Sequence, residues 1–244
     1  MPRFSNILLT ASLCLAALLL LGCLAPDRVQ AAAMDGVLEK AQAEGRLTQE
    51  EAETIKTRID LARTQGLPSA PFTTKVDEGL AKRIPGGAII RALDAMRDDY
   101  AFARDALARG GHSPAPEDIA LAGDSLRLGL SRPELTELAG LEPPPPAAML
   151  ATAARTRAYL NAIGFPAELS ANILRQGLAS GALTPGWTQL FRVVQRTRGA
   201  GMSDAAVAEA ASRTLAEMGG LNALLQELGF TGRDTRQAPR DIEK

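Results

Sequence analysis

A signal for the start of a helix recurs along this chain, and it constrains the fold more than any other feature. Thr48 lies three residues before Glu51, and Ser131 lies three residues before Glu134. This is the spacing of a capping box, in which each side chain bonds the backbone N–H of the other residue. The remaining starts are Thr184-Pro185, Met202-Ser203 and His112-Ser113-Pro114. Proline at the first helical position needs no N–H, and serine is a favoured N-cap residue, so these starts also predict helices.

Composition and periodicity agree with a helical chain. Only nine aromatic residues and six valines occur among 244 residues, whereas strands favour β-branched and aromatic side chains. Between Pro85 and Gly110 apolar residues recur every three or four positions, which predicts one long helix with a single buried face. Shorter helices are predicted at 35–44, 48–65, 72–82, 116–129, 131–140, 147–162, 168–179, 185–198, 203–218 and 220–228. We therefore expect an all-α fold, a compact array of short helices.

Four consecutive prolines interrupt this pattern at 143–146. Such a run cannot continue a helix and favours an extended, stiff conformation. We interpret it as a spacer between a helical domain at 34–142 and a second at 147–230. The tail 231–244 has almost no apolar residues, so we expect it to be disordered.

The two predicted helical domains share a short similarity. Residues 66–81 (GLPSAPFTTKVDEGLA) align with 164–179 (GFPAELSANILRQGLA), with identical residues at five positions. The match is consistent with a duplication that made two related halves. It is equally consistent with chance, because both segments are rich in alanine and glycine.

The first residues have the layout of a secretory signal. Arg3 is followed by an uncharged apolar run from Ile7 to Leu21 and then by small residues. The run is shorter than the roughly 20 residues that cross a bilayer as a helix. We therefore predict a signal peptide at 1–22 and an exported protein.

Two cleavage sites compete at the end of this signal. Leu20-Leu21-Gly22-Cys23 resembles the lipobox of bacterial lipoproteins, which implies lipidation of Cys23 and a tether at 23–33. Val29-Gln30-Ala31 resembles an ordinary signal-peptidase site, and a cut near 31 would leave a soluble periplasmic protein. We favour the lipoprotein cut, which anchors the protein in a membrane facing the periplasm. Two acyl chains suffice for stable anchoring.

Cysteine content and net charge limit the kinds of partner that the protein is expected to bind. Cys14 and Cys23 are the only cysteines and both lie in the signal region, so no disulfide is expected in the mature domain. Removal of 1–22 takes away one of the 27 basic residues and none of the 28 acidic ones. This balance predicts no nucleic-acid partner and no basic membrane-binding patch. The predicted partners are the membrane, through lipid on Cys23, and another protein.

The most prominent polar cluster surrounds Gly79. It consists of Lys75, Asp77, Glu78, Lys82 and Arg83. One interpretation is a binding face. The interpretation that we favour is a solvated helix surface, because Glu78 and Lys82 have the spacing of a surface ion pair. Gly79 would then mark close helix packing.

Motifs for catalysis or metal binding are lacking in the sequence. His112 is the sole histidine. One histidine is too few for the usual zinc ligand sets, and a serine triad would have to use His112 as its base. Asp98-Asp99 and Glu50-Glu51 are adjacent acids that point about 100° apart on a helix. Trp187 and Phe191 suit either a ligand platform or, as we favour, the core. Arg192, Arg196 and Arg198 are expected to face solvent. We assign no catalytic, cofactor-binding or metal-binding residue and expect no cofactor.

Residues 66–93 contain Gly-Leu-Pro, then Lys75, Glu78, Gly79 and Lys82, then a proline and an apolar helix. This segment resembles a family of uncharacterised exported bacterial helical proteins, and the similarity extends loosely to 126–138. The resemblance implies export and no particular activity. The sequence predicts a non-enzymatic envelope protein that binds proteins or serves as a structural module. The alternative is a periplasmic cell-wall hydrolase or small-ligand binder that uses carboxylates.

Overall fold

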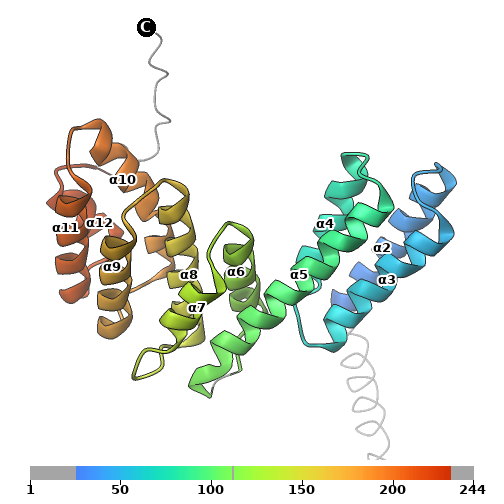
Figure 1. The fold of residues 1–244 in the computed structure, drawn as a ribbon, viewed down its shortest axis with the longest axis horizontal. Helices are drawn as coiled ribbons and strands as arrows, with labels where there is room; N and C mark the ends of the chain where they lie inside the picture. The colour runs from blue at the N-terminus through green and yellow to red at the C-terminus, as the bar shows by residue number, and fades with distance from the viewer. Residues whose placement is uncertain (1–25, 112, 232–244) are drawn as a thin grey trace, which may run out of the picture. The chain divides into compact units, whose positions relative to one another are not determined.

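The structure, a computed structural model, describes residues 26–111 and 113–231 (Figure 1). This part of the chain contains eleven α-helices, two short 3₁₀ helices and no strand, which confirms the predicted all-α fold. The α-helices are α2 (Pro26–Ala43), α3 (Gln49–Thr64), α4 (Ala70–Ala81), α5 (Gly86–Leu107), α6 (Pro116–Arg127), α7 (Arg132–Ala139), α8 (Ala147–Ala162), α9 (Ala167–Ser180), α10 (Leu190–Gly199), α11 (Asp204–Ala216) and α12 (Leu221–Glu227). The 3₁₀ helices are η1 (Ala108–Gly110) and η2 (Pro185–Gln189).

Most helix boundaries lie within three residues of those predicted from the sequence. Two elements differ. Helix α2 begins at Pro26, so part of the segment predicted as a tether, 23–33, is helical. The helix predicted at 185–198 is divided into η2 and α10. The predicted signal peptide, Cys23, His112 and nearly all of the predicted disordered tail lie outside the described residues.

The capping signals explain several helix starts. The Thr48 hydroxyl accepts from the Glu51 N–H at 3.1 Å, and the Thr48 N–H donates to the Glu51 carboxylate at 3.0 Å. Ser131 and Glu134 form the second predicted capping box. Ser203 accepts from the N–H of Ala206 at 3.3 Å. The helix predicted at 116–129 begins at Pro116 as predicted, but the residue before it is Ala115 rather than the Ser113 of the predicted start signal.

A common turn ends most of these helices. One residue adopts a left-handed conformation, and the N–H of the next residue donates to a carbonyl five positions back. Examples are Leu67 to Ala62 at 3.0 Å and Phe165 to Leu160 at 3.0 Å. Among the described residues, eight glycines adopt this conformation, for which they carry no steric penalty. Because turns outside the aligned segments have the same geometry, it does not distinguish duplication from chance.

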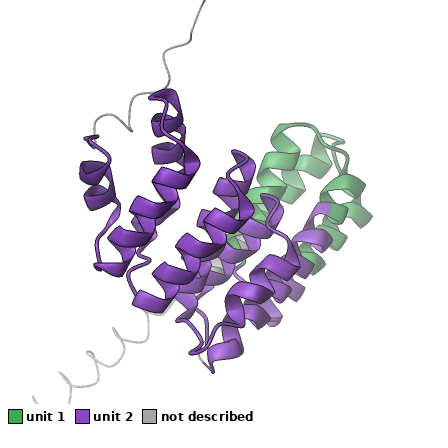
Figure 2. Ribbon diagram, turned by 60° about the vertical axis from the view of Figure 1, so that its left-hand side comes forward, with its two compact units in different colours: residues 1–60, 69–91 green, residues 61–68, 92–244 purple. Residues whose placement is uncertain are grey.

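The chain forms two compact units (Figure 2). Unit 1 comprises residues 1–60 and 69–91, and unit 2 comprises 61–68 and 92–244. This division differs from the predicted one at the prolines 143–146. Helices α6 and α8, which lie before and after those prolines, pack against each other within unit 2.

In unit 1, the described residues place α2 beside α4 over a small aliphatic and aromatic core. Ile55, Phe72 and Val76 are fully buried there. Helices α4 and α5 approach closely at Gly79. A Cβ at this position would lie 2.8 Å from Cγ1 of Ile89, closer than side chains pack. The interpretation of Gly79 as a helix-packing residue is confirmed.

Helix α8 is central to unit 2. It contacts α6, α7, α9, α10 and η2, and α9 also packs on α11 (Figure 1). Four buried alanines, Ala151, Ala153, Ala154 and Ala158, let these neighbours approach the α8 backbone. None of the helices that the structure describes is both long and apolar enough to span a bilayer.

Candidate functional site

The connection between α4 and α5 has an arginine at the left-handed position that glycine occupies in most of the other turns; Met218 occupies the corresponding position after α11. Arg83 adopts the left-handed conformation at φ +56°, and the N–H of Ile84 donates to the carbonyl of Gly79 at 2.9 Å. The turn is thus the same as those made by the glycines at 45, 66, 129, 164, 201 and 229. A residue with a side chain is less stable in this conformation by about 1–2 kcal/mol. Such local strain is found most often at functional sites.

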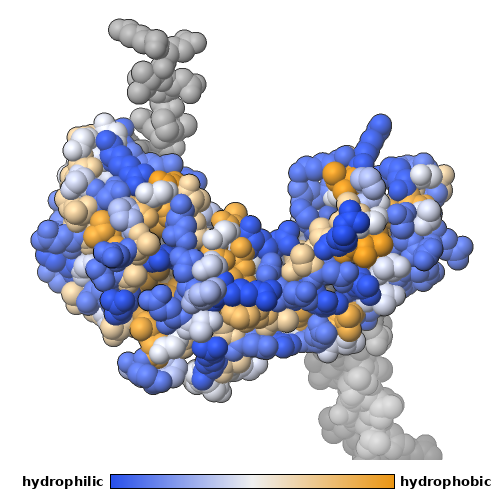
Figure 3. Space-filling model, in the orientation of Figure 1, coloured by the Kyte–Doolittle hydropathy of each residue, from blue (hydrophilic) through white to orange (hydrophobic). Residues whose placement is uncertain are grey.

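The side chain that follows Arg83 is also unusual. Ile84 is 41 % exposed, whereas Leu67, Leu130 and Phe165 at the same turn position are 3–4 % exposed, and Met202 and Phe230 there are half-buried. Figure 3 shows hydrophobic residues exposed among hydrophilic ones over α4 and the start of α5. The turn therefore presents an aliphatic side chain to solvent, whereas three of the equivalent turns bury one.

A hollow of about 370 Å³ lies beside this turn. We call it the Arg83 hollow. It is lined by Glu44, Arg46, Leu80, Arg83, Ile84 and Pro85, all of unit 1. Its lining combines an apolar surface with three charged side chains.

The two arginines of the Arg83 hollow differ in their partners. Arg46 forms an ion pair with Glu44 at 2.6 Å, and its Nη1 donates to the carbonyl of Leu80 at 3.2 Å. The Arg46 Nε is buried and has no hydrogen-bond partner in the described part of the chain. Arg83 has no ion pair or hydrogen bond from its guanidinium to any described residue. The positive charge of Arg46 is balanced within the hollow, and that of Arg83 is not.

The rest of the predicted polar cluster is a surface ion-pair group on α4. Lys75 and Lys82 both donate to the carboxylate of Glu78, Lys75 at 2.9 Å. Hydrogen bonds from Lys82 and then Lys75 lower the pKa of Glu78 to about 2. The predicted Glu78–Lys82 pair is confirmed. The structure separates this group from Arg83, which lines the hollow.

The two acids of each adjacent pair have different surroundings. Glu51 is bonded in its capping box and also accepts from the N–H of Gly87 at 3.0 Å. Glu50 instead lines a shallow, open hollow of about 670 Å³ together with Glu53. Asp98 pairs with its neighbour Arg97, whereas Asp99 accepts from Arg132 of α7 at 3.1 Å.

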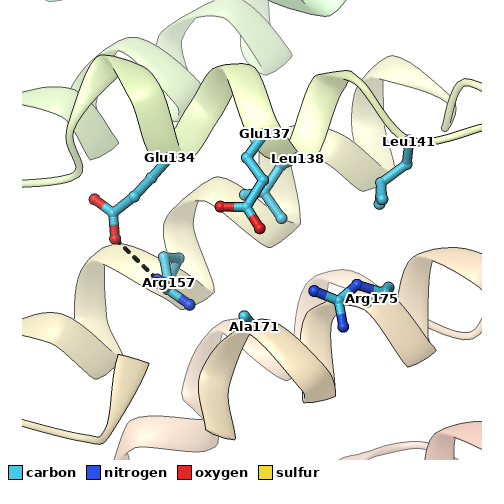
Figure 4. A pocket seen from close by; sticks show the side chains of 7 residues that line it. All are labelled: Glu134, Glu137, Leu138, Leu141, Arg157, Ala171 and Arg175. Carbon is cyan, nitrogen blue, oxygen red and sulfur yellow. Dashed lines mark hydrogen bonds and ion pairs between the residues drawn. The ribbon is translucent and has the colours of Figure 1, made fainter. Parts of the chain in front are cut away.

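A second polar cluster joins three helices of unit 2 at a small cleft (Figure 4). The carboxylate of Glu134 on α7 accepts from Nε of Arg157 at 3.0 Å and from Asn161 at 3.1 Å, both on α8. Arg157 is buried and also donates to Ser170 Oγ of α9 at 2.7 Å. The cleft has about 20 Å³ of free volume, room for roughly one water molecule. We interpret the cluster as a packing contact rather than a ligand site.

The pKa of Glu134 reflects this network. Burial disfavours its charged form, but hydrogen bonds from the Ser131 N–H and hydroxyl, from Asn161 and from Arg157 outweigh burial and lower the pKa to about 2. Sequence reasoning found the Ser131–Glu134 capping box because it is local. It missed Arg157, since nothing in the sequence links residues 23 positions apart.

The aromatic residues near α10 belong to the packing of unit 2. Trp187 is completely buried, which confirms the core interpretation over a ligand platform. Its indole Nε1 has no hydrogen-bond partner among the described residues. Phe191 is half-buried and packs against Tyr159 with ring centroids 4.8 Å apart.

The three arginines predicted to face solvent divide into two kinds. Arg192 and Arg196 are exposed and lie over the rings of Phe191 and Phe230. Arg198 is also exposed, but it forms hydrogen bonds with Asp204 at 2.7 Å and with the carbonyl of Ile163 at 2.7 Å. The prediction for Arg198 missed this anchoring role, because its partners lie on other helices.

No group of three or more metal-ligating side chains occurs in the described residues. Comparison with known proteins gives no match to any family model, curated protein or solved structure.

Proposed function

We propose that this protein is an exported, non-enzymatic helical protein of the cell envelope that binds another protein through the Arg83 hollow. The observation that carries the proposal is the exposed Ile84 beside Arg83 in a strained turn. The proposal includes membership of the exported helical family that residues 66–93 resemble.

The chemistry of the hollow supports protein binding over catalysis. Protein interfaces favour an apolar centre, arginine side chains and a polar rim. The Arg83 hollow has an aliphatic surface formed by Leu80, Ile84 and Pro85, next to two arginines. Its one carboxylate, Glu44, is held by Arg46. This lining suits a docked side chain better than acid–base chemistry.

The sequence supports lipid anchoring through Cys23, with the protein facing the periplasm. The test is to express the full chain in a bacterium with a radiolabelled fatty acid and compare wild type with Cys23→Ala. We expect label in the wild type alone. An unlabelled wild type whose N-terminus lies near Ala32 would contradict anchoring and favour a soluble periplasmic protein.

Site-specific photo-crosslinking tests the binding surface. A photoreactive amino acid is placed at Ile84 and, as a matched control, at Leu128, which is similarly exposed at 46 % but lies in unit 2. We expect a discrete protein adduct from position 84 in growing cells and none from position 128. Equal adducts from both positions, or none from 84, would contradict the proposed surface.

One observation favours a second candidate function. Glu50 and Glu53 line the open hollow on α3, together with the polar side chains Thr54 and Thr57. A carboxylate-dependent cell-wall hydrolase or ligand binder would use this surface. Both threonine hydroxyls donate to backbone carbonyls of their own helix, which makes them poorer ligand contacts. Release of soluble fragments from purified cell wall by wild type, and its loss in Glu50→Gln/Glu53→Gln, would support this alternative.

A further inference from the structure

We propose that the Arg83 hollow binds a short peptide segment of a partner protein in which an acidic residue lies beside a large apolar one. This inference rests on the proposed function and specifies its partner. The acidic side chain pairs with Arg83, and the apolar side chain packs on Ile84, Leu80 and Pro85.

Charge complementarity supports the acidic residue. Among the side chains that line the hollow, Glu44 is occupied by Arg46, and Arg83 has no partner in the described structure. The lining therefore holds two arginines and one carboxylate and carries one excess positive charge. A carboxylate forms a geometrically specific pair with a guanidinium, so an acidic ligand fits best.

The apolar residue follows from the exposed aliphatic surface. Covering Ile84 removes apolar area from water, which is the main favourable term in most protein association. A hollow of about 370 Å³ lies at the lower end of the 300–1,000 Å³ typical of ligand sites. It accommodates a short segment of chain rather than a folded domain.

The backbone supplies an independent argument. Glycine would adopt the left-handed conformation of residue 83 without strain, as it does at eight other turns. An arginine at position 83 makes the folded state less stable than glycine would, and the side chain is all that it adds. Arg83→Gly therefore removes the proposed contact while keeping the turn, which separates binding from folding.

The test is a selection from a random seven-residue peptide library displayed on phage. The target is the exported full chain, purified in detergent. Enriched peptides are then synthesised, and their affinities are measured by fluorescence anisotropy for wild type, Arg83→Gly, Ile84→Asp and Met218→Gly. Met218 is the matched control, because it is the other described non-glycine residue at positive φ, is exposed and lies in unit 2.

We expect enriched peptides to carry Asp or Glu next to Leu, Ile, Val or Phe. Arg83→Gly and Ile84→Asp should each weaken binding by about tenfold or more, the loss expected from one buried contact, and Met218→Gly should not change it. Peptides that lack an acidic residue, or that lose affinity only in Ile84→Asp, would overturn this inference and leave the proposed function intact.

Three other outcomes would overturn the inference, and the last two of them identify a different occupant. An absence of enriched peptides overturns both this inference and the proposed function. Self-association in analytical ultracentrifugation that Ile84→Asp abolishes assigns the hollow to a second copy of the chain. Binding of Cys23→Ala protein to phosphatidylglycerol vesicles that Arg83→Gly abolishes assigns it to a lipid surface. If either of the last two results is obtained and the selection enriches no acidic peptide, the peptide inference is overturned.

Discussion

The carboxylate of Glu51 accepts a hydrogen bond from the backbone N–H of Gly87 at 3.0 Å, across 36 positions of sequence. The same carboxylate completes the capping box with Thr48, so one side chain satisfies N–H groups near the starts of both α3 and α5. A Cβ at residue 86 would lie 2.5 Å from the Glu51 carboxyl carbon. Gly86 therefore leaves the space that this carboxylate occupies.

Glu51→Ala should lower the free energy of unfolding by about 1–2 kcal/mol, because capping bonds contribute roughly 0.5–2 kcal/mol and a second N–H also loses its partner. The measurement is urea denaturation followed by circular dichroism. Glu50→Ala is the matched control. It removes an acidic side chain from the same first turn of α3, and no described residue donates a hydrogen bond to its carboxylate. Equal losses for the two variants would show that the Gly87 contact contributes nothing.

The Glu51 contacts show which features of this fold are visible in sequence. The capping box was predicted because its two residues lie within one helical turn. The Gly87 contact was not, since it depends on how α3 and α5 pack. The same limit applies to Arg157, whose partners on α7 and α9 are brought together only by tertiary structure. Local patterns predicted the helices, and the long-range polar contacts came from the structure.

Gly123→Ala should destabilise unit 2 by about 3 kcal/mol or more, because overpacking of a rigid core is costly. A Cβ at residue 123 would lie 2.1 Å from the ring of Tyr100, which is fully buried and donates to Asp124 at 2.6 Å. The ring therefore has little freedom to move. Thermal unfolding monitored by circular dichroism measures the loss.

The control for this variant is Gly199→Ala at the end of α10. A Cβ there meets no atom within 4 Å, so no loss of stability is expected. A Gly123→Ala protein as stable as Gly199→Ala would show that Tyr100 can shift without cost.

Glu134 should make the stability of the protein depend on acidic pH. Its pKa is lowered from 4.5 to about 2 in the folded state, so the folded protein binds fewer protons than the unfolded chain. The stabilisation is present above about pH 4.5 and is lost as pH falls toward 2. Melting temperatures measured from pH 7 to pH 2 should therefore fall more steeply for wild type than for Glu134→Gln. Parallel curves would contradict a role for the charged form.

The candidate site was only partly predictable. Sequence reasoning grouped Arg83 with the charged residues of α4 because they lie close together in sequence. In the structure, Arg83 lies in the turn after α4 in a left-handed conformation and lines the hollow, apart from the ion-pair group of α4. A local signal was present: Arg83-Ile84-Pro85 stands where the comparable turn has Gly66-Leu67-Pro68. An arginine in place of that glycine indicates a strained turn, but the exposure of Ile84 depends on the packing of α4 and α5.

Removal of this strain should stabilise the protein. Arg83→Gly relieves a left-handed conformation that costs about 1–2 kcal/mol. Glycine also gives the unfolded chain more conformational freedom, which offsets roughly 0.5–1 kcal/mol of this gain. We expect a net gain of about 0.5–1 kcal/mol in the unfolding transition of unit 1, measured by urea denaturation. Met218→Gly, at φ +60°, should give a similar gain in unit 2.

Glu217→Gly is the matched control. Glu217 precedes Met218 at φ −86°, so its replacement should destabilise the protein. If Arg83→Gly behaves like Glu217→Gly, the arginine stabilises its turn, and strain at residue 83 is no argument for function. A gain in stability would leave peptide binding as the contribution of the Arg83 side chain.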